Sequence, residues 1–154
     1  MVDDPINLID STGLDWIYSQ STGQMTHPVD GGSPDGGATV VDTGYSGHGN
    51  GVNNSAMQRE AGTGPIPQGT YTIQPQQDNV TANGTSLPGS MRITMPDGGS
   101  TLINLPDGGT RSGFLIHGDN PQGNRTASNG CIILQRSTRD QIGSSGDNTL
   151  RVVP

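Results

Sequence analysis

The stretch "GFLIHGDNPQGNRTASNGCIIL", residues 113–134, decides the fold of this chain because it holds two of the clearest apolar runs. One run, residues 114–116, ends in His117, and the other, residues 132–134, follows Cys131, the only cysteine. Short apolar runs bounded by Gly, Asn and Ser predict strands with a loop between them. If the two strands are neighbours, an imidazole and a thiol meet at their ends.

The rest of the sequence predicts a mainly β fold in one domain over residues 1–154, with residues 1–13 as an N-terminal extension. Gly and Pro, at 25 and 11 residues, are too frequent for long helices. The motif Pro-Asp-Gly-Gly occurs three times and is typical of tight turns between strands. Further β-like runs lie at 15–18, 38–41, 70–73, 91–95, 101–105 and 150–153, the turns at 34–37, 96–99 and 106–109, and short helical segments at 54–60 and from Ser137 to Ile142.

The composition excludes several classes of protein. A net charge of −7 argues against a nucleic-acid-binding protein, which needs a basic surface. All seven basic residues are Arg, so chemistry that requires a Lys is excluded. A single Cys excludes an internal disulfide and a zinc site of the Cys₄ or Cys₂His₂ kind. We therefore expect no metal and no cofactor.

The sequence also lacks the usual targeting signals. No apolar run reaches the ~18 residues that a membrane span requires, so no membrane insertion is expected. The segment Met1–Pro5 is acidic and no apolar stretch follows it, so no secretory signal peptide is predicted. We expect a protein made in the cytoplasm without a signal peptide.

Cys131 and His117 carry the side chains needed for nucleophilic catalysis. An imidazolium beside a thiol lowers the thiol pKa by several units and yields the reactive thiolate. The histidine then returns the proton to the leaving group. The Gly118 carbonyl or the Asp119 carboxylate could orient the imidazole, and backbone N–H groups near Gly130 could form an oxyanion hole. The alternative is that Cys131, next to an apolar run, is a small buried hydrophobic residue.

The segment "IHGDNPQGNRTASNGCIIL", residues 116–134, resembles the active-site signature of L,D-transpeptidase (YkuD-like) catalytic domains. Two upstream segments, "GTGPIPQGTYTI" at 62–73 and "WIYSQSTGQM" at 16–25, are similar to the same family and occur in the same order. The resemblance implies a YkuD-like β-sandwich with one or two short helices and long Gly-rich loops.

Two departures narrow the match. Asn129 stands where most members have a second His, and Ile133 stands where many have an Arg. Together with "GYSGHGNGVNN" at 44–54, they resemble a divergent branch, the L,D-transpeptidase-like toxins delivered by type VI secretion systems. That branch implies action on peptidoglycan tetrapeptide stems. The activity would be L,D-carboxypeptidase cleavage of the diaminopimelate–D-Ala bond, with exchange of the terminal D-amino acid.

The family motif also implies a role for each site residue. Cys131 would be the nucleophile and His117 the acid/base, with the Gly118 carbonyl orienting His117. The substrate-binding residues would be Ser128, Asn129 and Gly130 in the oxyanion loop, Tyr45 and His48 in the substrate groove, and Arg125 on a stem carboxylate. His48 and Arg125 as ordinary exposed side chains are the alternative.

The implied partners are the peptidoglycan stem, free D-amino acids as acceptors, an immunity protein and a component of the secretion machine. The protein would act in the periplasm of a target bacterium. Two other functions stay open at this point: a crosslinking L,D-transpeptidase, and a non-catalytic cell-wall-binding β domain in which the thiol is inert.

Overall fold

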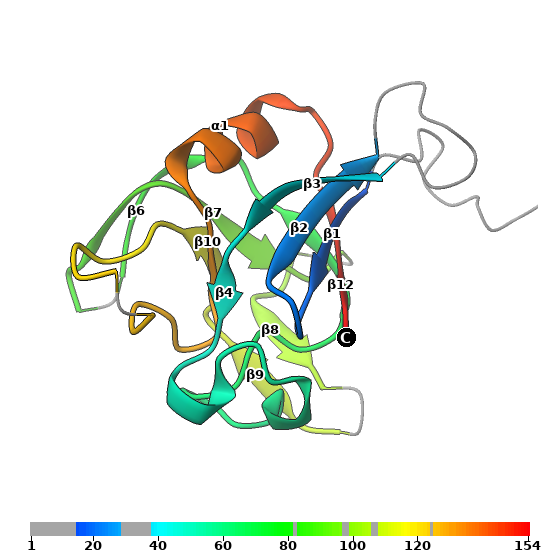
Figure 1. Ribbon diagram of the computed structural model, residues 1–154, viewed down its shortest axis with the longest axis vertical. Coiled ribbons are helices and arrows are strands. Elements are labelled where there is room, and N and C mark those ends of the chain that lie inside the picture. Colours follow the sequence, from blue (N-terminus) through cyan, green and yellow to red (C-terminus); the bar gives the residue numbers. More distant parts are fainter. Residues whose placement is uncertain (1–14, 29–37, 82, 97–98, 106–107, 124) are drawn as a thin grey trace, which may run out of the picture.

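The structure is a computed structural model, and it describes residues 15–28, 38–81, 83–96, 99–105, 108–123 and 125–154. Within these ranges the chain forms a mainly β fold with one α-helix, which confirms the predicted class (Figure 1). The expected N-terminal extension, 1–13, and the first Pro-Asp-Gly-Gly turn, 34–37, lie outside the described residues.

Most strands belong to one ten-stranded sheet. Every apolar run that predicted a strand overlaps a strand, either of this sheet or of the separate hairpin. β6 (Gln77–Val80) pairs with β7 beside the main path, and β8 (Leu102–Asn104) and β9 (Thr110–Ser112) form a separate antiparallel hairpin. Along the path the order is β3 (Ala38–Thr43), β2 (Gln24–Pro28), β1 (Trp16–Ser19), β12 (Thr149–Val153), β5 (Gly69–Ile73), β7 (Ser86–Thr94), β10 (Leu115–His117), β11 (Ile132–Ile133) and β4 (Tyr45–Ser46).

The long strand β7 connects the two halves of this sheet. Ile93 of β7 pairs with Ile73 of β5, and Met91 pairs with Ile116 of β10. The N-terminal part of β7 pairs with β6. Because one strand serves both halves, the strands form a continuous ten-stranded sheet plus a hairpin. The YkuD-like β-sandwich stays a prediction.

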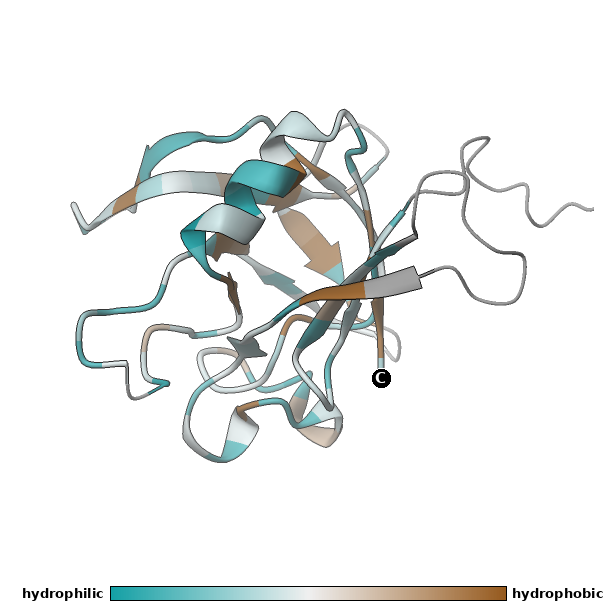
Figure 2. Cartoon of the chain, turned by 45° about the horizontal axis from the view of Figure 1, so that its top comes forward, coloured by the Kyte–Doolittle hydropathy of each residue, from teal (hydrophilic) through white to brown (hydrophobic). Residues whose placement is uncertain are grey.

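The strand β12 lies inside the sheet, parallel to β1 and antiparallel to β5. Its Leu150 lies opposite Trp16 on one side and opposite Tyr71 on the other, and all three side chains are buried. Figure 2 shows hydrophobic positions on the interior strands and a largely hydrophilic outer surface on the helix and loops. The core consists of Trp16, Tyr18, Met25, Ile66, Tyr71, Ile73, Met91, Ile93, Ile103, Phe114, Ile116, Ile132, Leu134, Ile142, Leu150 and Val152.

The helix α1 (Arg136–Ser144) confirms the predicted helix, although it begins one residue before the expected Ser137. Gln135 occupies the N-cap position without a side-chain cap, and Asp140 accepts a hydrogen bond from Arg136 Nε at 2.9 Å. The helix buries Arg139, whose guanidinium donates to the carbonyl groups of Leu134, Pro88 and Gly89. In the described part of the chain, no helix is long and apolar enough to cross a membrane.

The shorter turns also follow the sequence. The helical segment expected near residues 54–60 is the 3-10 turn η3 (Ser55–Met57), which follows a first 3-10 turn, η2 (Gly49–Gly51). The second Pro-Asp-Gly-Gly motif lies between β7 and β8, and the third connects β8 to β9. Gly108 and Gly109 of the third motif have φ of 101° and 88°, angles that Gly adopts without strain.

The central position of Leu150 predicts a large cost for its truncation. Leu150→Ala should lower the free energy of unfolding by about 2–5 kcal/mol, because the side chain is fully buried between two strands and its removal leaves a cavity. Leu102→Ala is the matched control, since that side chain is 52% exposed and should change stability by less than about 1 kcal/mol. Urea denaturation measures both, and equal losses would contradict the placement of β12.

Candidate functional site

The pairing of β10 with β11 brings His117 and Cys131 together. The two strands are parallel neighbours, with Ile116 opposite Ile132. Parallel neighbours need a connection of about a dozen residues or more, and the loop 118–131 provides it. Cys131 therefore lies level with the start of β10, while His117 ends the same strand. Both residues line one pocket of about 480 Å³. A direct contact between the imidazole and the thiol stays a prediction.

His117 is oriented by the backbone of the next residue. Its Nδ1 lies 2.8 Å from the Gly118 carbonyl oxygen, which can only accept, so Nδ1 carries the proton and donates. The other ring nitrogen, Nε2, is then the basic one. Burial lowers the pKa of His117, the Gly118 hydrogen bond opposes this shift, and Arg139 adds to it. The imidazole is therefore neutral near neutral pH and can accept a proton.

Cys131 is partly exposed and is held by the backbone of the segment before β10. Its sulfur accepts a hydrogen bond from the Leu115 N–H at 3.3 Å, and its S–H donates to the Gly113 carbonyl at 3.7 Å. Burial raises the pKa of the thiol, and this effect outweighs the lowering by Leu115 N–H and by Arg111. We expected a thiolate stabilised by an imidazolium, whereas both shifts favour the neutral forms. Such a pair reacts by transferring the thiol proton to His117 during attack.

Ser128 shapes the loop that presents the thiol. Its buried hydroxyl donates to the Cys131 carbonyl at 2.6 Å and accepts from the Gly130 and Gly47 N–H groups, both at 2.9 Å. The Gly130 N–H is thus committed inside the loop and is not free to bind an oxyanion in this conformation. The Gly130 carbonyl accepts from Ser46 Oγ at 2.8 Å. Ser128 and Gly130 therefore lie where the oxyanion loop was expected and stabilise it internally.

Asn129 is exposed between the buried Ser128 and Gly130. It lines the pocket of Cys131 and His117, and also a second pocket of about 380 Å³ on the other side of Cys131. Its carbonyl accepts a hydrogen bond from Arg111 Nη2 at 3.2 Å. The residue that replaces the expected second histidine therefore lines both described pockets of Cys131.

Tyr45 ties the loop together and does not line either pocket of Cys131. Its hydroxyl donates to Asp119 Oδ1 at 2.6 Å and accepts from the Ala127 N–H at 3.1 Å. Burial raises the pKa of Tyr45 to about 12, with the Asp119 hydrogen bond as the next cause. Asp119 thus binds Tyr45. Of the two groups expected to orient His117, the Gly118 carbonyl and the Asp119 carboxylate, only the Gly118 carbonyl binds its ring.

His48 and Arg125 lie away from the thiol. His48 is exposed, and its backbone N–H donates to the Thr63 carbonyl. Arg125 is exposed, has a φ of 63°, and places its guanidinium 5.5 Å from the centre of the Tyr45 ring. Neither residue is among those that line the two described pockets of Cys131. Their expected contacts with substrate stay predictions.

Sequence reasoning missed Arg111 and Ser46, two buried residues beside the nucleophile loop. Arg111 donates to the Asn129 carbonyl, and Ser46 bridges the Gly130 carbonyl and the Ile66 N–H. The signal that could have found Ser46 is its place inside the quoted segment 44–54. No sequence signal indicates Arg111, because its partner Asn129 lies 18 positions away.

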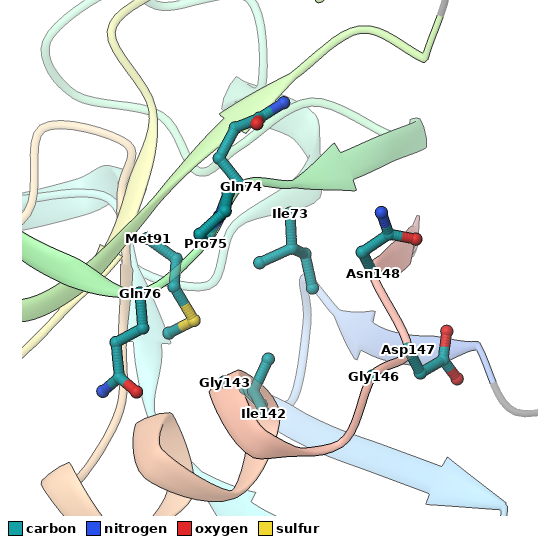
Figure 3. Close-up of a pocket in the computed structure, with 10 residues that line it drawn as sticks. All are labelled: Ile73, Gln74, Pro75, Gln76, Met91, Ile142, Gly143, Gly146, Asp147 and Asn148. Atoms are coloured by element: carbon teal, nitrogen blue, oxygen red, sulfur yellow. The ribbon is translucent and has the colours of Figure 1, made fainter.

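A third pocket, of about 450 Å³, lies beside the C-terminal end of α1 and is lined by neither His117 nor Cys131 (Figure 3). Its floor is apolar, with Ile73, Met91 and Ile142, and Gln76 and Asp147 lie at its rim. It contains no thiol and no imidazole. In the described ranges of the chain, no group of three or more His, Cys, Asp or Glu residues could hold a metal ion.

The fold and site together define a mainly β protein in which a cysteine and a histidine from neighbouring parallel strands line one pocket. Residues 41–153 match the family described as the Tlde1 domain, and the chain belongs to this family of type VI secretion effectors. Membership implies secretion and suggests an immunity partner and a secretion machine. A search of curated proteins finds no match to the chain.

The family match covers the whole of the candidate site and leaves out β1 and β2. These two strands nevertheless supply Trp16, Tyr18 and Met25 to the core. The N-terminal strands therefore belong to the same folded unit as the matched residues.

Gly130 tests the packing of the nucleophile loop. Its φ is 133°, and a Cβ atom there would lie 2.7 Å from both Arg111 Nη2 and Phe114 Cε1. Gly130→Ala should therefore cost about 1–3 kcal/mol for backbone strain and a further ~1–3 kcal/mol for the clash. Gly84→Ala is the matched control, because Gly84 has a φ of 89° and open space around the missing Cβ. Urea denaturation of both variants should show the larger loss for Gly130; equal losses would contradict the described packing.

The raised thiol pKa predicts slow alkylation of the folded protein at neutral pH. The rate of iodoacetamide modification of Cys131 should rise with pH through a midpoint above the ordinary thiol value of ~8.5, because burial disfavours the thiolate. The same chain unfolded in denaturant is the control and should show a midpoint near the ordinary value. A folded midpoint at or below the unfolded one would show that a preformed ion pair exists.

Proposed function

We propose that this protein is a peptidoglycan-modifying cysteine enzyme that acts on tetrapeptide stems in the periplasm of a target bacterium. Cys131 is the nucleophile, His117 the general base and acid, and Gly118 the residue that orients His117. The observation that supports this most directly is the shared pocket, which is lined by the partly exposed Cys131 and by His117, whose Nδ1 is held by the Gly118 carbonyl. That arrangement leaves Nε2 free to take the thiol proton.

The proposed reaction proceeds in two stages. Cys131 transfers its proton to His117 Nε2 while the sulfur attacks the carbonyl carbon of the diaminopimelate–D-Ala bond. The C–N bond breaks, His117 returns the proton to the departing amine, and a thioester links the stem to Cys131. Water then releases the tripeptide, which is L,D-carboxypeptidase activity. A D-amino acid instead restores a tetrapeptide with a new end.

The neutral resting state suits an enzyme that must not react with other electrophiles during export. The raised pKa of Cys131 keeps the thiol protonated until substrate excludes water and His117 accepts the proton. Membership of a type VI effector family supports a target outside the producing cell, and the resemblance to L,D-transpeptidases supports the stem as substrate.

Purified protein incubated with tetrapeptide muropeptides should yield tripeptides, and tetrapeptides ending in D-Met when D-Met is supplied. Cys131→Ser and His117→Ala should each reduce the rate by at least about a thousandfold, because the two residues act as one unit. Arg151→Gln is the control, since Arg151 is exposed on β12, and it should keep full activity. Mass spectrometry measures all products.

Other products would redirect the assignment. Dimeric muropeptides with 3-3 links would identify a crosslinking L,D-transpeptidase. Intact tetrapeptide with folded wild-type protein would contradict the proposal and favour a non-catalytic cell-wall-binding domain.

A further inference from the structure

Arg111 lies behind the nucleophile loop, on β9 of the separate hairpin, and its side chain is only 6% exposed. Its guanidinium donates to four backbone carbonyl groups from two other segments. Nη1 binds Gln58 O at 2.7 Å and Pro65 O at 2.8 Å, and Nη2 binds Gly64 O at 3.1 Å and Asn129 O at 3.2 Å.

These contacts join two segments that form a wall beside the thiol. Gln58, Gly64 and Pro65 belong to the segment before β5, and Asn129 lies two residues before the nucleophile. Both terminal nitrogens of the guanidinium are committed, so Arg111 cannot offer a bidentate fork to a carboxylate of a substrate. Arg111 therefore binds backbone carbonyl groups of the protein and not a substrate.

The fit around Arg111 is tight. The Phe114 ring lies under the guanidinium, with the Arg111 Cζ atom 5.0 Å from the ring centre. On the other side, Gly130 comes so close that a Cβ would lie 2.7 Å from Arg111 Nη2. Arg111 is thus packed between the residue before β10 and the residue before Cys131. A shift of the Arg111 guanidinium would therefore move the loop that carries the thiol.

Arg111 has no salt bridge within the described residues, although Glu60 interacts with it at longer range. The carbonyl dipoles stabilise the cation, but a thiolate at Cys131 would be a nearby full negative charge. The presence of Arg111 lowers the pKa of the Cys131 thiol, although burial outweighs it.

We propose that Arg111 is a positioning residue of the acyl-transfer site, which fixes the Asn129 carbonyl and hence the Cys131 loop, and stabilises the thiolate as it forms. This inference rests on the proposed function for its catalytic consequence. Its effect on the thiol itself does not depend on any substrate.

The charged and titratable groups around the thiol are few. His117 shares the pocket from β10, and Arg111 faces the thiol from β9. Glu60 and Tyr71 act on Arg111. Arg139 of α1 acts on His117, and neither Arg139 nor Asp119 is among the causes that shift the Cys131 pKa. The thiol titration should therefore respond to Arg111 and not to Arg139.

The experiment compares Arg111→Gln, Arg111→Lys and Arg139→Gln. Arg139 is a matched control because it is also a buried Arg that donates to backbone carbonyl groups. The first measurement is the pH dependence of iodoacetamide alkylation of the folded protein. The second is kcat and KM on tetrapeptide muropeptides. Thermal unfolding reports the folded fraction of each variant.

Arg111→Gln should shift the alkylation midpoint upward, with about a three- to tenfold smaller thiolate fraction at a given pH, because the nearby cation is lost. Its kcat should fall at least about tenfold with little change in KM. Arg111→Lys should restore the alkylation midpoint but not kcat, because a Lys keeps the charge and loses the planar fork. Arg139→Gln should leave the midpoint unchanged.

A folded Arg111→Gln variant with the wild-type midpoint and wild-type kcat would overturn the proposal. So would loss of folded protein in both Arg111 variants, because the role would then be structural alone. If wild-type protein leaves muropeptides intact but Arg111→Gln still shifts the midpoint, the proposed function fails while the coupling of Arg111 to the thiol stands.

Discussion

The parallel pairing of β10 with β11 is the constraint on which the rest of the site depends. Its register sets Ile116 opposite Ile132 and thereby fixes how far Cys131 lies from His117 along the sheet. Because alternate residues of a strand face opposite sides, a slip by one residue would turn His117 away from the thiol's pocket. The buried Ile116 and Ile132 side chains prevent such a slip, so the hydrophobic core holds the reactive pair in place.

Around this pair the protein uses backbone carbonyl groups where charged partners could have been used. The Gly118 carbonyl holds His117, the Gly113 carbonyl accepts from the thiol, and Arg111 donates to carbonyl groups. Carbonyl acceptors do not titrate, so the contacts of His117 and Arg111 persist over a wide pH range, whereas the contact of Gly113 lasts only while the thiol is protonated. Arg111 is the cation that lowers the pKa of Cys131, but burial raises this pKa by more.

The sequence predicts the parts of the fold that depend on local patterns. Apolar runs predict every strand that buries them, and the runs beside His117 and Cys131 predict their meeting. Strands such as β2, β4, β6 and β9 are polar and were missed, because hydrogen bonds to neighbours, more than their own hydrophobicity, make them strands. Arg111 was missed, and the hydrogen bond from Tyr45 to Asp119 was not foreseen, for a related reason: their partners lie far away in sequence. The direction of the thiol pKa depends on burial, which a one-dimensional pattern does not record.

The interior position of β12 has a consequence for biosynthesis. Both edges of β12 are hydrogen-bonded, to β1 on one side and to β5 on the other. Until residues 149–153 have been synthesised, β1 and β5 lack the strand that joins them, so this part of the sheet cannot close. Long-range pairing of this kind forms slowly. In the described chain, β1, β2 and β3 therefore join the rest of the sheet only after the strands that carry His117 and precede α1 have been made.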